Sequence, residues 1–182
     1  TTENGLCTTL KQAYEAAKDP NATGVIYVCS PVSIGGSDDP YLGDQAIQYK
    51  RYKTHTGYMF MVSPGETATL NGAQVDGGGF AVQNAMIKCG PGSVLKITGN
   101  TDLKNANNIG IENPGGAVDI LFGTLEMDAG TIQGNYAEGG GGGICVRGSG
   151  AKAVITGGTI SENKADSDGG GILISDGAEL RM

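Results

Sequence analysis

The chain has 182 residues, enough for one domain with a continuous core, and it carries 33 glycines but only 6 prolines. The glycines have no collagen-like three-residue period and separate short apolar runs, which argues against a collagenous or disordered chain. The net charge of −7 argues against a nucleic-acid partner, and no apolar run reaches the roughly 20 residues of a membrane span.

A single amphipathic helix is predicted near the start of the chain, over about residues 5–18. Asp19-Pro20-Asn21 ends it, because proline cannot continue a helix. The apolar residues at helical spacing are Leu6, Leu10, Ala13, Tyr14 and Ala17.

Short β-rich runs follow this helix, and Gly, Asn, Asp and Pro separate them. They cover residues 25–28, 46–49, 58–62 and 67–70. Two longer insertions, residues 30–43 and 50–57, break the regularity. Loops on a rigid scaffold are where function tends to lie, so these insertions are the first places to look for it.

Self-similarity in the second half of the chain gives the fold. Gly-Thr-Ile-Gln-Gly-Asn at 130–135 matches Gly-Thr-Ile-Ser-Glu-Asn at 158–163, an offset of 28 residues. Gly-Gly-Gly-Ile-Cys-Val at 141–146 matches Gly-Gly-Gly-Ile-Leu-Ile at 169–174 with the same offset. The triplet that begins at Leu125 recurs at 153 and, after 27 residues, at 180; a looser copy begins at Leu95 and continues through 103–105 and 109–111.

Each repeat contains three short apolar triplets, of which the clearest are Ile144-x-Val146, Ala153-x-Ile155 and the approximate Thr159-Ile160. Alternate residues of a strand share one face, so three such strands per repeat make a triangular coil whose apolar sides face inward. Crossovers between parallel strands are overwhelmingly right-handed. The sequence therefore predicts an all-β, right-handed parallel β-helix with three short strands per coil and a repeat of about 28 residues.

The corners and ends of the coils carry further expectations. The glycine runs suit sharp turns, and Asn135 and Asn163 are expected at equivalent corners, in the left-handed conformation or in a stacked amide ladder. Residues 1–21 are expected to cap the open end of the stack, and residues 22–182 to form the β-helix. Because Met182 falls within a triplet, we expect further coils or domains C-terminal to it.

Units of the form Gly-Gly-Thr-Ile-x-x-Asn-x-Ala, followed by Gly-Gly-Gly-Ile, resemble the repeats of right-handed β-helix, pectin-lyase-like surface proteins and adhesins of host-associated bacteria, including gut commensals. Residues 50–78 resemble the first coils of such proteins, and the resemblance covers the chain from about Ala22. It implies an extracellular, cell-surface location. It does not imply one activity, because many functions share this fold.

The same fold hosts polysaccharide lyases and glycoside hydrolases, which need converging carboxylates. The only adjacent Asp pair, Asp38-Asp39, precedes a proline and is interpreted as a solvated turn. Arg147 is expected to form a surface ion pair with Asp119 or Asp176. We therefore predict no catalytic residue, and keep a lyase or hydrolase fragment as the alternative function.

No cofactor or metal is expected. The segment 166–169, Asp-Ser-Asp-Gly, resembles the start of a calcium loop but lacks the downstream ligands, which favours a plain turn. The four cysteines have no CxxC spacing. Cys7 and Cys29 could form a disulfide, and the alternative is that all four are small buried hydrophobic residues.

One loop is a candidate for ligand contact, because tyrosines suit glycan and protein partners. Its residues are Tyr49, Tyr52, His55 and Tyr58, and His55, the only histidine, is expected to be solvent-exposed. The alternative is that the tyrosines cover the open end of the helix. We therefore expect a non-catalytic module that adheres to, or is presented toward, a host glycan or protein ligand, or else a purely structural spacer.

Overall fold

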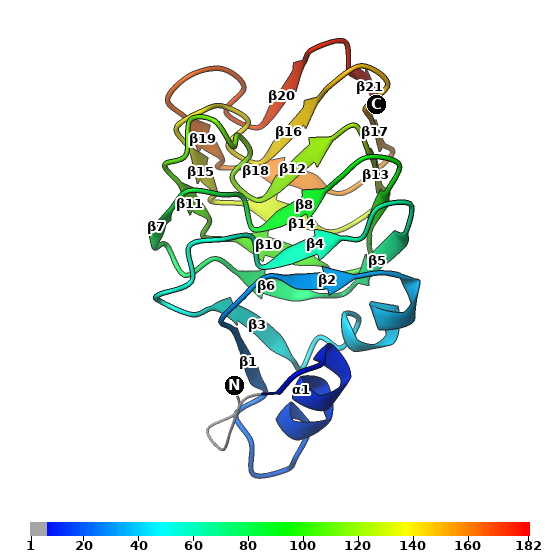
Figure 1. The fold of residues 1–182 in the computed structure, drawn as a ribbon, viewed down its shortest axis with the longest axis vertical. Coiled ribbons are helices and arrows are strands. Elements are labelled where there is room, and N and C mark those ends of the chain that lie inside the picture. Colours follow the sequence, from blue (N-terminus) through cyan, green and yellow to red (C-terminus); the bar gives the residue numbers. More distant parts are fainter. Residues whose placement is uncertain (1–6) are drawn as a thin grey trace.

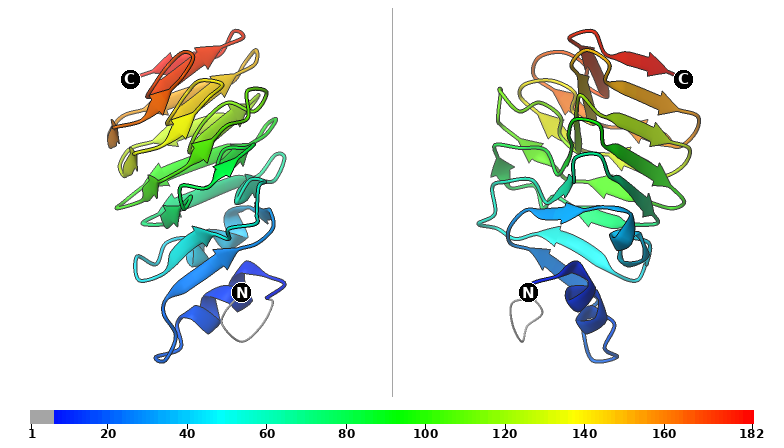
Figure 2. Two further views of the ribbon diagram at one scale, coloured as in Figure 1. Left: turned by 90° about the vertical axis from the view of Figure 1, so that its left-hand side faces the viewer. Right: turned by 45° about the vertical axis from the view of Figure 1, so that its right-hand side comes forward.

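The computed structural model describes residues 7–182, which form a parallel β-helix whose coils stack along the long axis of the molecule (Figure 1). Four parallel sheets run along the stack; from Gln74 onward each coil contributes one strand to each sheet, whereas the coils before it lack some of these strands. Figure 2 shows the successive coils lying one above another from the N-terminal to the C-terminal end. The predicted parallel β-helix fold is confirmed. Within the described residues, no helix is long and apolar enough to cross a membrane.

Sheets I and II have six strands each. Sheet I contains β1 (Val25–Val28), β3 (Gln48–Arg51), β6 (Gln74–Asp76), β10 (Asp102–Lys104), β14 (Thr131–Gln133) and β18 (Thr159–Ser161). Sheet II contains β2 (Val32–Ile34), β4 (Phe60–Val62), β8 (Ile87–Cys89), β12 (Val118–Leu121), β16 (Ile144–Arg147) and β20 (Ile172–Ser175).

Sheets III and IV are smaller. Sheet III contains β5 (Thr67–Asn71), β9 (Val94–Thr98), β13 (Thr124–Met127), β17 (Lys152–Ile155) and β21 (Glu179–Arg181). Sheet IV contains the two-residue strands β7 (Ala81–Val82), β11 (Asn107–Asn108), β15 (Tyr136–Ala137) and β19 (Lys164–Ala165). The three strands predicted for each coil are the strands of sheets I, II and III. The strands of sheet IV are an additional, fourth element of the coil, and they have no apolar triplet.

The strand register matches the sequence repeats. Ile144 pairs with Ile172, which is the 28-residue offset, and Ala153 pairs with Leu180, which is the 27-residue offset. Leu95 pairs with Leu125 across the looser, 30-residue repeat. Equivalent residues therefore lie directly above one another, as a stack of coils requires.

One predicted triplet is wrong. Ile109 and Ile111 lie outside the strands and are 38% and 65% exposed. In that coil the inward positions of sheet II are Val118 and Ile120, both fully buried. The loop before β12 is longer here and itself contains an apolar-x-apolar pattern. The pattern alone therefore cannot tell a strand from a loop.

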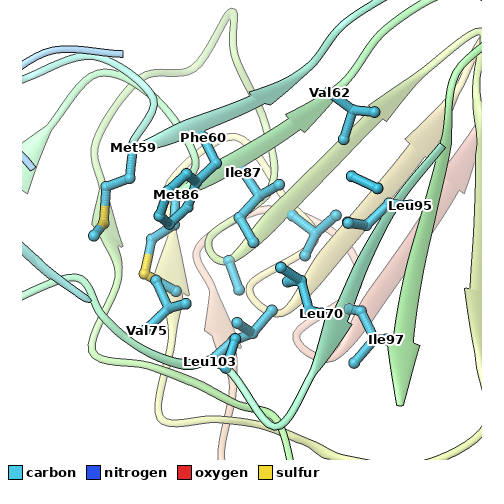
Figure 3. Close-up of a cluster of buried hydrophobic side chains, with 14 of the residues drawn as sticks. Met59, Phe60, Val62, Leu70, Val75, Met86, Ile87, Leu95, Ile97 and Leu103 are labelled. Carbon is cyan, nitrogen blue, oxygen red and sulfur yellow. The ribbon is translucent and has the colours of Figure 1, made fainter. Parts of the chain in front are cut away.

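The interior of the stack is filled by aliphatic side chains that point inward from successive strands (Figure 3). Leu70, Leu95, Ile97 and Leu103 are each at most 1% exposed. Full burial of such a side chain contributes about 1.5–3 kcal/mol, so the stacked rows supply much of the free energy of folding. The labelled residues of Figure 3 are Met59, Phe60, Val62, Leu70, Val75, Met86, Ile87, Leu95, Ile97 and Leu103.

The helix α1 (Leu10–Ala17) lies at the N-terminal end of the stack (Figure 1). The hydroxyl of Thr9 caps it by accepting a hydrogen bond from the Gln12 amide at 3.2 Å. Leu10, Ala13 and Ala17 are buried and belong to the same core as the first coils. Residues 5 and 6 of the predicted helix lie outside the described residues.

The glycine-rich corner before sheet II is a second ladder between coils. Gly115, Gly141 and Gly169 occupy equivalent places, and all three have φ between 65° and 89°, which favours glycine. The amide of Gly116 donates to the carbonyl of Gly141, and the corresponding bonds recur one coil later. These corners therefore pair backbone with backbone, as the strands do.

The asparagines form the predicted amide ladder. Oδ1 of Asn163 accepts from the backbone amide of Asn135 at 3.0 Å and from its Nδ2 at 2.9 Å. Oδ1 of Asn135 accepts in turn from the Ala106 amide at 3.0 Å. The left-handed conformation falls instead on the preceding residues of the corner, Gly134 and Glu162.

The four cysteines are free thiols. Cys89 and Cys145 are buried, which fits the interpretation of cysteine as a small hydrophobic residue, whereas Cys29 is exposed. The structure contains no Cys7–Cys29 disulfide.

Replacing Gly116 by alanine is expected to destabilise the protein by about 3 kcal/mol, because the added Cβ overlaps the Gly142 carbonyl oxygen, which the corner ladder holds in place. Gly90→Ala is the matched control, since a Cβ there meets no atom within 4 Å, and it should stay within about 0.5 kcal/mol of wild type. Urea unfolding measures both. Equal stabilities for the two variants would contradict the close stacking of the corners.

Candidate functional site

The predicted tyrosine and histidine loop does not form one surface. Tyr49 points into the core from β3, is 0% exposed, and packs its ring against Phe60 at a centroid distance of 5.6 Å. His55 and Tyr58 are also buried, so the expectation that His55 is solvent-exposed is wrong. Tyr52 alone among the four is exposed, at 38%, and its ring meets that of Tyr27 edge-on at 6.2 Å. Ligand contact at this loop stays a prediction.

A buried arginine organises this loop from inside. Arg51 is 2% exposed and donates hydrogen bonds to the carbonyl oxygens of His55, Gly57 and Ala85. Burial lowers the pKa of Arg51 to about 10. Three backbone carbonyl groups thus surround the guanidinium, two of them from the insertion at 50–57, so this insertion has a structural role. The sequence signal for this buried arginine is that Arg51 lies two residues after Tyr49 and so shares its inward face of β3.

His55 is held neutral in the same cluster. Its Nε2 donates to the Tyr58 carbonyl at 2.7 Å, in the tautomer that carries the proton on that nitrogen. Burial is the main cause that lowers the pKa of His55, and the charge of Arg51 adds to it, while the bond to Tyr58 works in the opposite direction. A buried neutral imidazole beside a cation supports the loop and is not placed for acid–base chemistry.

Stability should therefore depend on pH through His55. The pKa in the folded state lies below the usual 6.5, so between the two pKa values the unfolded chain binds more protons than the folded one. The stability that depends on a neutral His55 is complete above about pH 6.5 and is lost as the pH falls toward the pKa of His55 in the folded state. We expect the midpoint of urea unfolding to decrease as the pH is lowered from 7.5 to 5.5, and to change less with pH in the His55→Gln variant. Identical pH profiles for the two proteins would contradict a lowered pKa of His55.

A second polar cluster lies on the outer face of sheet II. Asp119 of β12 is 0% exposed, and both of its carboxylate oxygens accept from Arg147 of β16, each at 3.1 Å. The Tyr58 hydroxyl lies 3.5 Å from Oδ2 of Asp119, and Nζ of Lys88 lies 5.1 Å from the centre of the Tyr58 ring. The prediction paired Arg147 with Asp119 or Asp176 at the surface; the partner is Asp119, and its burial makes the surface assignment wrong.

This cluster is built for stability. A bidentate arginine occupies both carboxylate oxygens, and the hydrogen bond to Asp119 raises the pKa of Arg147. Burial and the neighbouring Asp119 raise the pKa of the Tyr58 hydroxyl. Asp119 is therefore not free to act as a general base, and Tyr58 does not ionise easily.

Arg147→Met should destabilise the protein by about 3–5 kcal/mol, because it leaves the Asp119 carboxylate buried and unpaired. The double variant Arg147→Met/Asp119→Leu should recover most of that loss, since it removes the uncompensated charge as well. Urea unfolding of the two variants and of Asp119→Leu completes the cycle. A double variant no more stable than Arg147→Met would show that the lost packing dominates.

A groove of about 720 Å³, open to solvent, lies at the N-terminal end of the stack. We call it the N-terminal groove. It is lined by Tyr14, Asp39, Pro40, Gly43, Asp44, Gln45, Thr69 and Asn71. These residues come from α1, from the 3-10 helix η1 (Gly36–Tyr41) and the loop after it, and from β5.

The groove forms because η1 takes the place of a strand. β5 is an edge strand of sheet III, and its Thr69 amide donates to Oδ1 of Asp39 at 2.7 Å. A side chain of η1 thus satisfies the open edge, as edge strands require. Oδ2 of the other carboxylate, Asp44, accepts from the Tyr14 hydroxyl at 3.0 Å, which ties α1 to the same wall.

The sequence partly anticipated this site. It marked the insertion at 30–43 as irregular and interpreted Asp38-Asp39 as a solvated turn. The structure places both residues in η1, where Asp38 accepts from the Gly35 amide at 3.1 Å and Asp39 accepts from β5. Asp44 and Asn71 were missed, because their proximity depends on how η1 docks against the coils.

Neither the groove nor the segment 166–169 has the ligands of a metal site. Among residues 7–182 no three His, Cys, Asp or Glu side chains lie close enough to hold a metal ion together. Asp166 accepts from the Tyr136 hydroxyl at 2.6 Å instead, and this bond lowers the pKa of Asp166.

Comparison with known proteins identifies no relatives. A scan against protein-family models, a search of curated proteins and a search of solved structures each found no match. The parallel β-helix therefore stands on the structure itself, and the resemblance to pectin-lyase-like adhesins of gut bacteria stays a prediction.

Proposed function

We propose that this chain is a non-catalytic, extracellular β-helix module of a bacterial cell-surface protein, and that it binds glycans in the N-terminal groove. The observation that carries the proposal is the groove, whose wall combines carboxylate, amide and hydroxyl groups in a volume of about 720 Å³. Ligand sites typically occupy about 300–1,000 Å³. The surface location rests on the repeat resemblance alone.

The chemistry of the buried clusters supports binding over catalysis. A glycosidase needs two carboxyl groups beside the scissile bond, one as general acid and the other as a base for water or as a nucleophile. Asp119 has both oxygens engaged by Arg147, and His55 is buried and neutral. The two acidic groups in the groove, Asp39 and Asp44, each already accept a hydrogen bond that shapes the wall. The runner-up, a lyase or hydrolase fragment, has no comparable support.

We expect the double variant Gln45→Ala/Asn71→Ala to lose glycan binding at least about tenfold, close to 1.4 kcal/mol, because it removes two amides from the groove wall. An array of neutral and acidic oligosaccharides identifies binders, and calorimetry measures their affinities. Gln83→Ala is the matched control, since Gln83 is an exposed amide outside the groove. Circular dichroism should show all of these variants folded.

Two results would overturn the proposal. One is an array without any binder that depends on Gln45 and Asn71. The other is release of product from a polysaccharide panel, with or without calcium, that a substitution of Asp39 or Asp44 abolishes. The second result would favour the lyase or hydrolase.

A further inference from the structure

The hydrogen-bonding groups left over in the N-terminal groove define what a ligand must offer. Oδ1 of Asp44 accepts from the Ala46 amide at 3.0 Å, and Oδ2 accepts from the Tyr14 hydroxyl. Oδ1 of Asp39 accepts from the Thr69 amide, whereas its Oδ2 accepts no hydrogen bond from the described residues. The wall therefore fixes the positions of both carboxylates, and each retains acceptor capacity beyond these bonds.

The amides of the wall are available as well. Gln45 and Asn71 are exposed, and their side chains form no hydrogen bond within residues 7–182. Each amide offers an NH₂ donor and a carbonyl acceptor. Together with the two carboxylates, the groove presents more acceptors than donors, which suits a ligand rich in hydroxyl groups.

Stacking on Tyr14 contributes little to this recognition. The Tyr14 ring lies 5.5 Å from that of Tyr41, and Nζ of Lys18 lies 5.1 Å from its centre. The Tyr14 hydroxyl already donates to Asp44, so the ring and the hydroxyl both have partners within the protein. Selection depends on polar groups and on charge.

The charge of the wall is negative. Its only ionisable acids or bases with a full charge are Asp39 and Asp44, in a chain with a net charge of −7. A cation lies beside the wall: Nζ of the half-exposed Lys18 is 4.0 Å from Oδ2 of Asp44. One ammonium group offsets only one of the two carboxylates, so the groove keeps a net negative charge.

We propose that the N-terminal groove selects uncharged oligosaccharides and rejects acidic ones such as uronate chains; this inference rests on the proposed glycan-binding function. A neutral sugar donates hydroxyl protons to Asp39 and Asp44 in charge-assisted hydrogen bonds and exchanges further bonds with Gln45 and Asn71. A uronate instead places its carboxylate against two others, and like charges at an interface act against the wrong partner.

Matched ligands test this selectivity. Oligogalacturonate, oligomannuronate and glucuronate-containing oligosaccharides are each compared with their carboxyl-reduced, neutral counterparts by calorimetry at low salt, where charge effects are least screened. For at least one pair, the neutral member should bind about tenfold or more tightly than the acidic one. The double variant Asp39→Asn/Asp44→Asn should bring the two affinities together, because it removes the negative charge and keeps the shape.

The control variant is Asp128→Asn/Asp168→Asn, which removes the same two negative charges at exposed positions outside the groove and should leave the preference intact. Equal or tighter binding of an acidic ligand, abolished by Gln45→Ala/Asn71→Ala, would overturn the selectivity while the glycan-binding function stands. The absence of any binding that depends on Gln45 and Asn71 would overturn both.

Discussion

Parallel pairing between successive coils is the constraint on which the rest of this molecule depends. A single coil has no interior of its own, so its inward side chains are buried only when the next coil lies directly above it. The pairing of Leu95 with Leu125 and of Leu125 with Ala153 keeps one column of apolar side chains continuous through the stack. A shift of one residue would turn each inward side chain outward, because the side-chain period of a strand is two.

The polar groups buried in this fold serve the same stacking. Asn135 and Asn163 satisfy the backbone where the chain turns between sheets I and IV, and the glycine corners do so before sheet II. Asp119 and Arg147 join neighbouring strands of sheet II across its outer face. No described buried side-chain nitrogen or oxygen lacks a hydrogen-bond partner, so these groups stiffen the stack without an unpaired polar atom in it. A scaffold this regular leaves irregular insertions as the places where a binding surface can differ from coil to coil.

Much of the fold was predictable from sequence because the repeat is short and local. The offsets of 28 and 27 residues correspond to observed strand pairs, and the amide ladder was one of two expectations for Asn135 and Asn163. The failures share a cause. Ile109 and Ile111 have the pattern of a strand but belong to a lengthened loop. His55 lies in an insertion with no buried pattern of its own, and it is buried because Arg51 binds the backbone of that insertion from inside. Insertions carry no repeat, so pattern alone does not place them.

The sequence by itself determined the coil, its period, its glycine corners and the helix before it, because each of these follows from residues close together or repeated at fixed spacing. The tertiary structure alone decided the candidate site. Asp39, Asp44, Gln45 and Asn71 form one wall only because η1 docks on the edge of β5 and α1 hydrogen-bonds to the loop that follows. Those contacts join segments about 30 residues apart that share no pattern, and their geometry depends on how a whole coil packs beneath the next.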